Sequence, residues 1–153
     1  MGAARREPEG LSPEEKAALR ETIAERRQAR HWQKNPAAAQ EAVESYIRTL
    51  PPADQQLAWK LHTLVQQVAP AFRPRLWYGM PAYTDVQGRV VCFFQPASKF
   101  KTRYATIGFT DAALLDEGNL WSVSYAVREI GDSEEIFFRE KLQRAFSSAS
   151  LKK

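Results

Sequence analysis

After about residue 70 the hydrophobic period of this chain changes from that of a helix to that of a strand, and this change constrains the fold more than any other feature. From about Ala53 to Ala69, large apolar residues recur at spacings of three and four, which predicts a helix with one buried face. Three later segments, 89–95, 103–109 and 123–129, favour the period of two that β-strands show. Helices followed by strands and a final helix predict an α+β fold, with an antiparallel sheet packed against helices.

The N-terminal part of the chain is predicted to be a charged helical arm. Ser12 caps this helix, Pro13 occupies its first position, and Glu15 completes a capping box. Few large apolar residues lie along 12–34, so we expect this helix to pack loosely or to project from the domain. The Asn35–Pro36 pair ends it.

The chain therefore divides into three predicted parts. Residues 1–36 form the arm, of which about the first ten are expected to be disordered. Residues 37–147 form the α+β domain, and residues 148–153 form a disordered tail. The final helix is expected to be capped by Asp132, with Glu135 completing a second capping box.

Composition limits the location and the partners. The chain has 22 basic and 18 acidic side chains, a net charge of +4, and the two signs are interspersed, so nucleic acid is not favoured as a partner. No apolar run suits a membrane span or a signal peptide, and the one cysteine excludes an internal disulfide. We expect a soluble cytoplasmic protein without a membrane partner, either a monomer or a homodimer.

Residues for catalysis or metal binding are scarce. His31 and His62 lie in different predicted helices, and Cys92 lies in the middle of an apolar strand. None of them belongs to a spaced pair such as CxxC or HxxxH, and no nucleophile or phosphate-loop motif occurs. We therefore predict no catalytic residue, no metal ligand and no cofactor, and enzymatic activity is not favoured.

The stretch from Leu76 to Phe109 contains the most unusual chemistry of the chain. Aromatic residues and methionine flank Gly79 and Pro81, which impose a specific kinked path. Three cations follow at alternating positions and would project to one side if the backbone there were extended. Trp121, which lies outside this stretch, adds one more aromatic ring. The predicted ligand-binding residues are therefore Trp77, Tyr78, Met80, Tyr83, Lys99, Lys101, Arg103 and Trp121.

Two interpretations of these residues stay open. In one, the rings close an end of the core and the cations are a solvated hairpin tip. In the other, the rings hold a flat or apolar group and the cations hold an anion. The second interpretation predicts a non-enzymatic domain that binds a small ligand or a partner protein through an aromatic-cationic surface.

Several motifs together resemble the YdhG-like domain family. They are Leu50–Pro51 and Ala69–Pro70 at helix ends, WYGMPAY at 77–83, and GRVVCFF at 88–94. The similarity covers about residues 40–147 and extends to a bacterial, actinobacterial-type subgroup with a charged N-terminal helix. The resemblance implies a small frataxin-like α+β domain, in a family that is largely of unknown function.

The resemblance adds one functional alternative, and the arm adds another. One branch of the family is described as an intracellular iron chaperone, which implies iron as the bound species. The helix over 12–34 ends with several basic residues, which leaves open an accessory module for nucleic-acid or protein interaction.

Overall fold

The computed structural model describes residues 10–151, with side chains described as far as Ser147. Within this range the chain forms five helices and five strands, which confirms the predicted α+β class. The elements are α1 (Pro13–Lys34), α2 (Pro36–Arg48), α3 (Pro52–Val68), β1 (Arg73–Trp77), β2 (Met80–Thr84), β3 (Val90–Gln95), α4 (Ala97–Phe100), β4 (Ala105–Phe109), β5 (Ser124–Val127) and α5 (Asp132–Leu151). The disorder predicted for residues 1–9 and 152–153 lies outside the described range. Residues 148–151, predicted as part of a disordered tail, instead continue helix α5. None of the described helices is long and apolar enough to cross a membrane.

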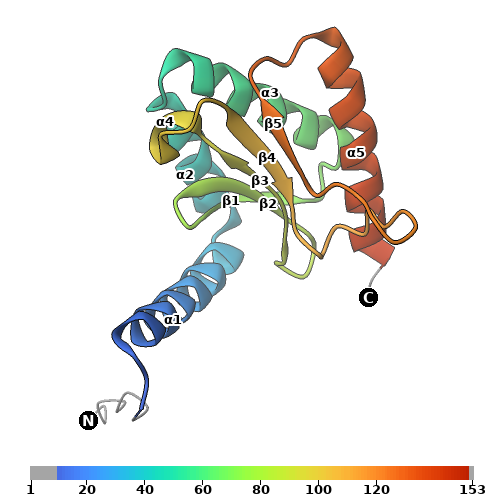
Figure 1. The fold of residues 1–153 in the computed structure, drawn as a ribbon. Helices are drawn as coiled ribbons and strands as arrows, with labels where there is room; N and C mark the ends of the chain where they lie inside the picture. The colour runs from blue at the N-terminus through green and yellow to red at the C-terminus, as the bar shows by residue number, and fades with distance from the viewer. Residues whose placement is uncertain (1–9, 152–153) are drawn as a thin grey trace.

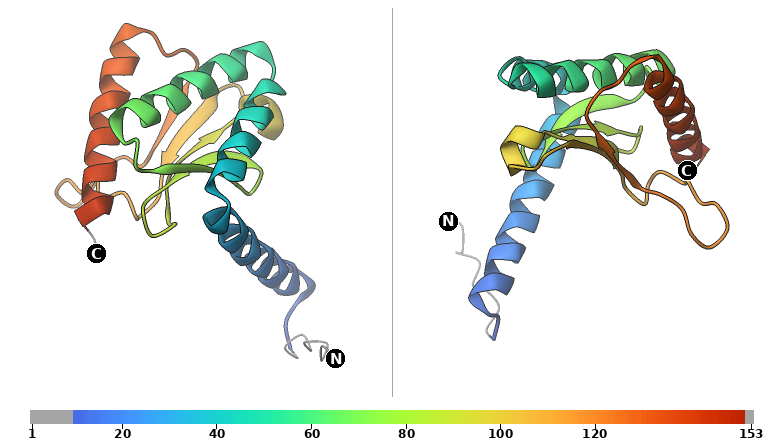
Figure 2. Two further views of the ribbon diagram at one scale, coloured as in Figure 1. Left: turned by 180° about the vertical axis from the view of Figure 1, so that it is seen from behind. Right: turned by 45° about the horizontal axis from the view of Figure 1, so that its top comes forward.

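The strands form one open antiparallel sheet in the order β1-β2-β3-β4-β5. Helices α2, α3 and α5 lie on one face of this sheet, whereas α1 projects away from the body of the domain (Figures 1 and 2). The predicted core helix is confirmed as α3, whose apolar stripe is buried against the sheet. The largest fully buried apolar side chains include Ile47, Leu61, Leu64, Phe94, Ile107, Leu142 and Phe146.

The two faces of the sheet carry different rows of cross-strand side chains. Tyr83 and Cys92 are cross-strand partners, as are Cys92 and Phe109, and their side chains belong to the core under the helices. The alternate positions Arg75, Ala82, Phe93 and Gly108 form a cross-strand row on the opposite face, which we call the open face.

The aromatic segment after α3 is a β-hairpin, which the sequence analysis did not predict. The expected kinked path is β1, a two-residue turn and β2, with Tyr78 (φ 49°) and Gly79 (φ 72°) both left-handed, as a type I′ turn requires. Pro74 and Pro81 obscured the strand pattern. Both occupy non-hydrogen-bonded positions of the β1–β2 pair, so no hydrogen bond between these strands is lost.

The N-terminal cap predicted for α1 is present in the structure, whereas the one predicted for α5 is displaced. At α1 the backbone N–H of Glu15 donates to Ser12 Oγ (3.1 Å), as predicted. At α5 the predicted box is displaced by one residue, because Gly131 N–H donates to Glu134 Oε1 (3.0 Å) and Asp132 already lies within the helix. Since glycine is an acceptable N-cap and Glu134 is then three residues on, the displaced arrangement still satisfies a backbone donor.

Candidate functional site

The structure brings together four of the eight predicted site residues. Trp77 and Met80 are cross-strand partners that flank the β1–β2 turn. The rings of Trp77 and Tyr78 lie 5.1 Å apart, and Tyr78 is half exposed. Lys99 reaches the same turn from α4. These residues form one end of the sheet, next to α1.

The other predicted residues lie elsewhere. Tyr83 is 1% exposed on the core face of the sheet, so it contributes to the core and not to a surface site. Trp121 lies in the loop before β5, where it lines a hollow with Phe137 and Lys141 of α5. The structure therefore does not bring these two residues together with Trp77, because strand alternation separates Tyr83 from it and Trp121 belongs to the β4–β5 connection.

The three predicted cations do not project to one side, because the backbone that carries them is not extended. Residues 97–100 form the short helix α4, and Lys101 that follows is left-handed (φ 53°). Lys99 Nζ donates to the carbonyl oxygens of Gly79 (2.8 Å) and Tyr78 (3.3 Å), so it fastens the β1–β2 turn. The Arg103 guanidinium lies 5.3 Å from the Tyr104 ring centre.

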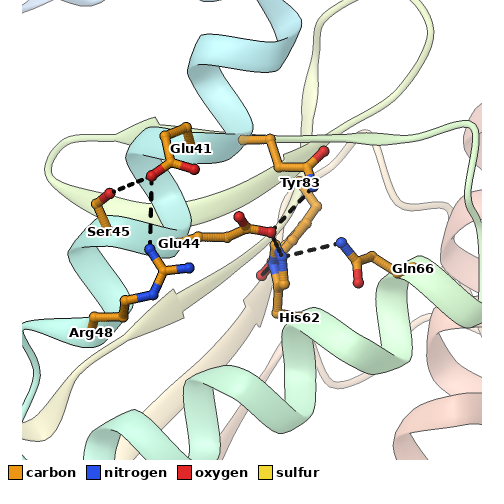
Figure 3. Close-up of polar contacts among 8 residues, drawn as sticks. Glu41, Glu44, Ser45, Arg48, His62, Gln66 and Tyr83 are labelled. Atoms are coloured by element: carbon orange, nitrogen blue, oxygen red, sulfur yellow. Dashed lines mark hydrogen bonds and ion pairs between the residues drawn. The ribbon is translucent and has the colours of Figure 1, made fainter.

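A buried polar network surrounds Tyr83 (Figure 3). His62 of α3 lies with Nδ1 2.9 Å from the Tyr83 hydroxyl and with Nε2 3.3 Å from Glu44 Oε1 of α2. One tautomer satisfies both contacts: the Tyr83 hydroxyl donates to Nδ1, and the Nε2–H donates to Glu44. The amide of Gln66, 3.2 Å from Nε2, borders the same imidazole.

The ionisation of this network follows from its burial. Desolvation raises the pKa of the Tyr83 hydroxyl well above its ordinary value. Desolvation also lowers the pKa of His62, although the hydrogen bond and the charge of Glu44 oppose this effect. Both groups are therefore neutral near pH 7, and the network joins α2 and α3 to the sheet through satisfied hydrogen bonds.

A second polar contact holds the arm. Arg75 of β1 donates from Nη2 to Glu25 Oε1 of α1 at 2.6 Å, and the two side chains are 6% and 17% exposed. Arg75 Nε also donates to the carbonyl of Leu76 (3.0 Å). The Gln33 amide of α1 lies over Gly88 in the β2–β3 turn, where a Cβ would meet it at 3.3 Å. The C-terminal half of α1 is thus docked against β1 and this turn, while its N-terminal half projects (Figure 1).

Three hollows lie along this contact, and together we call them the arm groove. One of about 130 Å³ lies between the end of α1, the start of α2 and β1. The others, of about 420 Å³ and 360 Å³, lie on the two sides of the Glu25–Arg75 pair. The hollows share wall residues, namely Glu25, Ala29, Trp32 and Arg75.

The walls of the arm groove combine rings with cations. Trp32 of α1, together with Trp77 and Tyr78 at the β1–β2 turn, supplies flat apolar surface. Arg26 and Arg73 also line the groove, and neither forms an ion pair with another residue of 10–147. Arg75 and Arg89 are instead paired with Glu25 and Asp85, and Asp111 lines the groove without an ion pair to any described residue.

Sequence reasoning missed most of this groove. Trp32 is not among the predicted site residues, yet it lines two of the three hollows. The alternation of Arg73, Arg75 and Trp77 along β1 is the signal that places these residues on one face. The Glu25–Arg75 contact joins residues 50 positions apart, so a local sequence pattern does not predict it.

Metal-binding groups do not cluster in the described structure. Across residues 10–147, no three His, Cys, Asp or Glu side chains lie close enough to hold a metal ion. Cys92 is fully buried, and desolvation raises the pKa of its thiol far above the ordinary value. The iron alternative therefore gains no support from side-chain geometry.

Comparison with protein-family models, curated proteins and solved structures returned no match. The resemblance to the YdhG-like domain family therefore stays a prediction, and the functional argument depends on the geometry of this chain.

Proposed function

We propose that this chain is a non-enzymatic binding domain, and that the arm groove takes a small ligand with a flat apolar part and an anionic group. The observation that carries the proposal is the meeting of three hollows beneath α1. Trp32 and Arg73 line the smallest hollow, and Trp77 and Arg26 line the largest one. Neither arginine forms an ion pair among the described residues. This proposal keeps the predicted aromatic-cationic character and Trp77 and Tyr78, but takes its cations from other positions.

The size of the groove suits a small ligand. Its two larger hollows have about 420 Å³ and 360 Å³. Ligand sites usually have volumes of about 300–1,000 Å³ and present a few polar groups on a mostly apolar wall. A flat ring in the 420 Å³ hollow would gain stacking and apolar contact with Trp77, and a carboxylate, sulfonate or phosphate would find the guanidinium of Arg26, which lines the same hollow.

The arm supplies one wall of this site, so binding depends on how α1 docks. No residue of α1 is fully buried, and the Glu25–Arg75 pair is its most buried ionic contact with the sheet. A ligand that contacts both Arg26 of α1 and Trp77 of β1 binds only the docked arm, and it therefore stabilises docking by mass action.

The test uses 8-anilinonaphthalene-1-sulfonate, a probe that is flat, apolar and singly anionic. We expect saturable fluorescence enhancement with the native protein, and at least about tenfold weaker binding after Trp77→Ala or Arg26→Ala. Trp121→Ala is the matched control, because Trp121 lines a different hollow. Equal weakening by Trp121→Ala, or undiminished binding by both groove variants, would refute the proposal; thermal melts of all variants exclude probe binding to unfolded chains.

The family resemblance and the iron and nucleic-acid alternatives remain predictions. No contact among the described residues favours iron or nucleic acid over a ligand in the arm groove.

A further inference from the structure

The two edges of the sheet differ in how they are protected. Edge strands expose unpaired backbone groups, and monomeric proteins usually block them with charge, proline or a covering element. The β1 edge has all three: Arg73 and Arg75, Pro74, and the docked arm. The segment 120–127 (LWSVSYAV), which contains β5, has no charged residue, proline or glycine.

The outer side of β5 has backbone groups available for another strand. Phe109 N–H donates to the carbonyl of Val123 (2.7 Å), and by alternation Tyr125 and Val127 are the residues that bond β4. The N–H and C=O groups of Ser124 and Ala126 therefore point outward. Both residues are exposed, and within the described residues β5 pairs with no strand other than β4.

Large apolar side chains are exposed beside this edge. Leu120 is 89% exposed, Val123 48%, Phe137 39% and Trp121 37%. Phe137 of α5 packs edge-on against Tyr125 with ring centres 5.2 Å apart, and the loop and α5 border a hollow of about 530 Å³. These four exposed side chains would supply part of the ~800 Å² per partner that a standard stable interface buries.

The edge is also complementary to itself. If two β5 strands pair antiparallel with Tyr125 opposite Tyr125, Ser124 lies opposite Ala126 and Val123 lies opposite Val127. The outward groups of Ser124 and Ala126 then bond each other twice across the axis. Every paired residue from 123 to 127 is neutral, so no like charges face each other, and a two-fold interface demands such self-complementarity.

We propose that β5 is a dimerisation edge: two copies of this chain join antiparallel through β5, around a two-fold axis at Tyr125. The two sheets then form one continuous sheet, and the exposed apolar groups of the 115–123 loop and α5 lie beside the same axis. The additional buried area comes from the paired backbones and from the neighbouring surface of α5. This inference is independent of the arm groove, which shares no lining residue with β5 or with the hollow beside it.

The test measures the oligomeric state of the full chain by sedimentation velocity from micromolar to submillimolar concentration. We expect a monomer–dimer equilibrium that Ala126→Pro weakens by about tenfold or more. Proline removes the outward N–H of Ala126, whereas the hydrogen bonds between β4 and β5 do not use that group. A monomer at every concentration would overturn the proposal.

A second variant keeps the test valid if the proline variant does not fold. Trp121→Glu places a charge in the loop beside the edge, outside the β4–β5 pairing, and is also expected to give a monomer. Val86→Glu is its matched control, because Val86 is 69% exposed in the β2–β3 turn. Equal loss of dimer in the two glutamate variants, or a dimer that persists in Trp121→Glu with native circular dichroism, would contradict the assignment.

Discussion

The imidazole Nδ1 of His62 lies 2.9 Å from the hydroxyl of Tyr83, deep between α3 and the sheet. This contact joins residues from two elements, and neither side chain has appreciable access to solvent. Its neighbour Glu44, on α2, extends the network to a third element (Figure 3). The polar network therefore forms only when α2 and α3 are packed against β2.

Removal of the Tyr83 hydroxyl is expected to destabilise the fold. In Tyr83→Phe the Nδ1 atom of His62 loses its partner, and an unsatisfied buried group costs about 1–3 kcal/mol of unfolding free energy. Urea unfolding followed by tryptophan fluorescence measures this change. Tyr78→Phe is the control, because the Tyr78 ring is half exposed at the hairpin turn; a loss below about 0.5 kcal/mol in Tyr83→Phe would show that the contact is not important.

The free energy of unfolding is expected to decrease as the pH is lowered through the range just below 6.5. Burial lowers the pKa of His62 in the folded chain, whereas in the unfolded chain the imidazole titrates near its ordinary value of 6.5. The unfolded state therefore binds more protons in the window below 6.5, and stability is lost as the pH falls through it. Urea midpoints measured between pH 5 and 8 should show a smaller slope in that window for His62→Gln, while His31→Gln, changed on the exposed arm, should keep it.

The Glu25–Arg75 pair is expected to couple the arm to the sheet. A double-mutant cycle with Glu25→Ala and Arg75→Ala should give a coupling of about 1–3 kcal/mol, because the Arg75 charge has little solvent to replace its partner. Glu41 and Arg48 provide the matched cycle, since that pair is exposed by 67% and 57% and is expected to contribute about 0–0.5 kcal/mol.

Hydrogen exchange distinguishes local from global effects of the arm contact. In Glu25→Ala we expect faster exchange of the α1 amides and little change in β3 and α3, because the domain core lies outside the contact. Faster exchange in every element would instead indicate that the pair supports the whole fold.

Gly108 is expected to accept no larger side chain while Phe93 is present. The Phe93 ring lies directly over Gly108 on the open face, and a Cβ at that position would overlap the Phe93 Cζ atom. Gly108→Ala should therefore lower the unfolding free energy by about 1–3 kcal/mol, the usual cost of overpacking. The double variant with Phe93→Leu should recover part of this loss; a more than additive loss in thermal melts would exclude direct contact as the cause.

Local sequence patterns predicted the long helices and three of the five strands of this protein, but not the short helix α4. The stripe of Leu57, Leu61 and Leu64 predicted α3, and the alternation in 89–95 and 103–109 predicted β3 and β4, because burial on one face imposes the period of each element. The β1–β2 hairpin escaped prediction because Pro74 and Pro81 usually indicate broken structure. Only the strand register shows that Pro74 and Pro81 occupy positions at which no backbone N–H is needed for a hydrogen bond between β1 and β2.

The site depended on tertiary structure. Sequence identified an aromatic-cationic region and placed Trp77, Tyr78 and Lys99 within it, since they are close in the chain or across one loop. The face on which each side chain lies follows from strand register, which put Tyr83 into the core beside His62 and Arg75 beside Glu25. Such contacts join residues 21 and 50 positions apart, and they arise from the packing of whole elements, which no local period encodes.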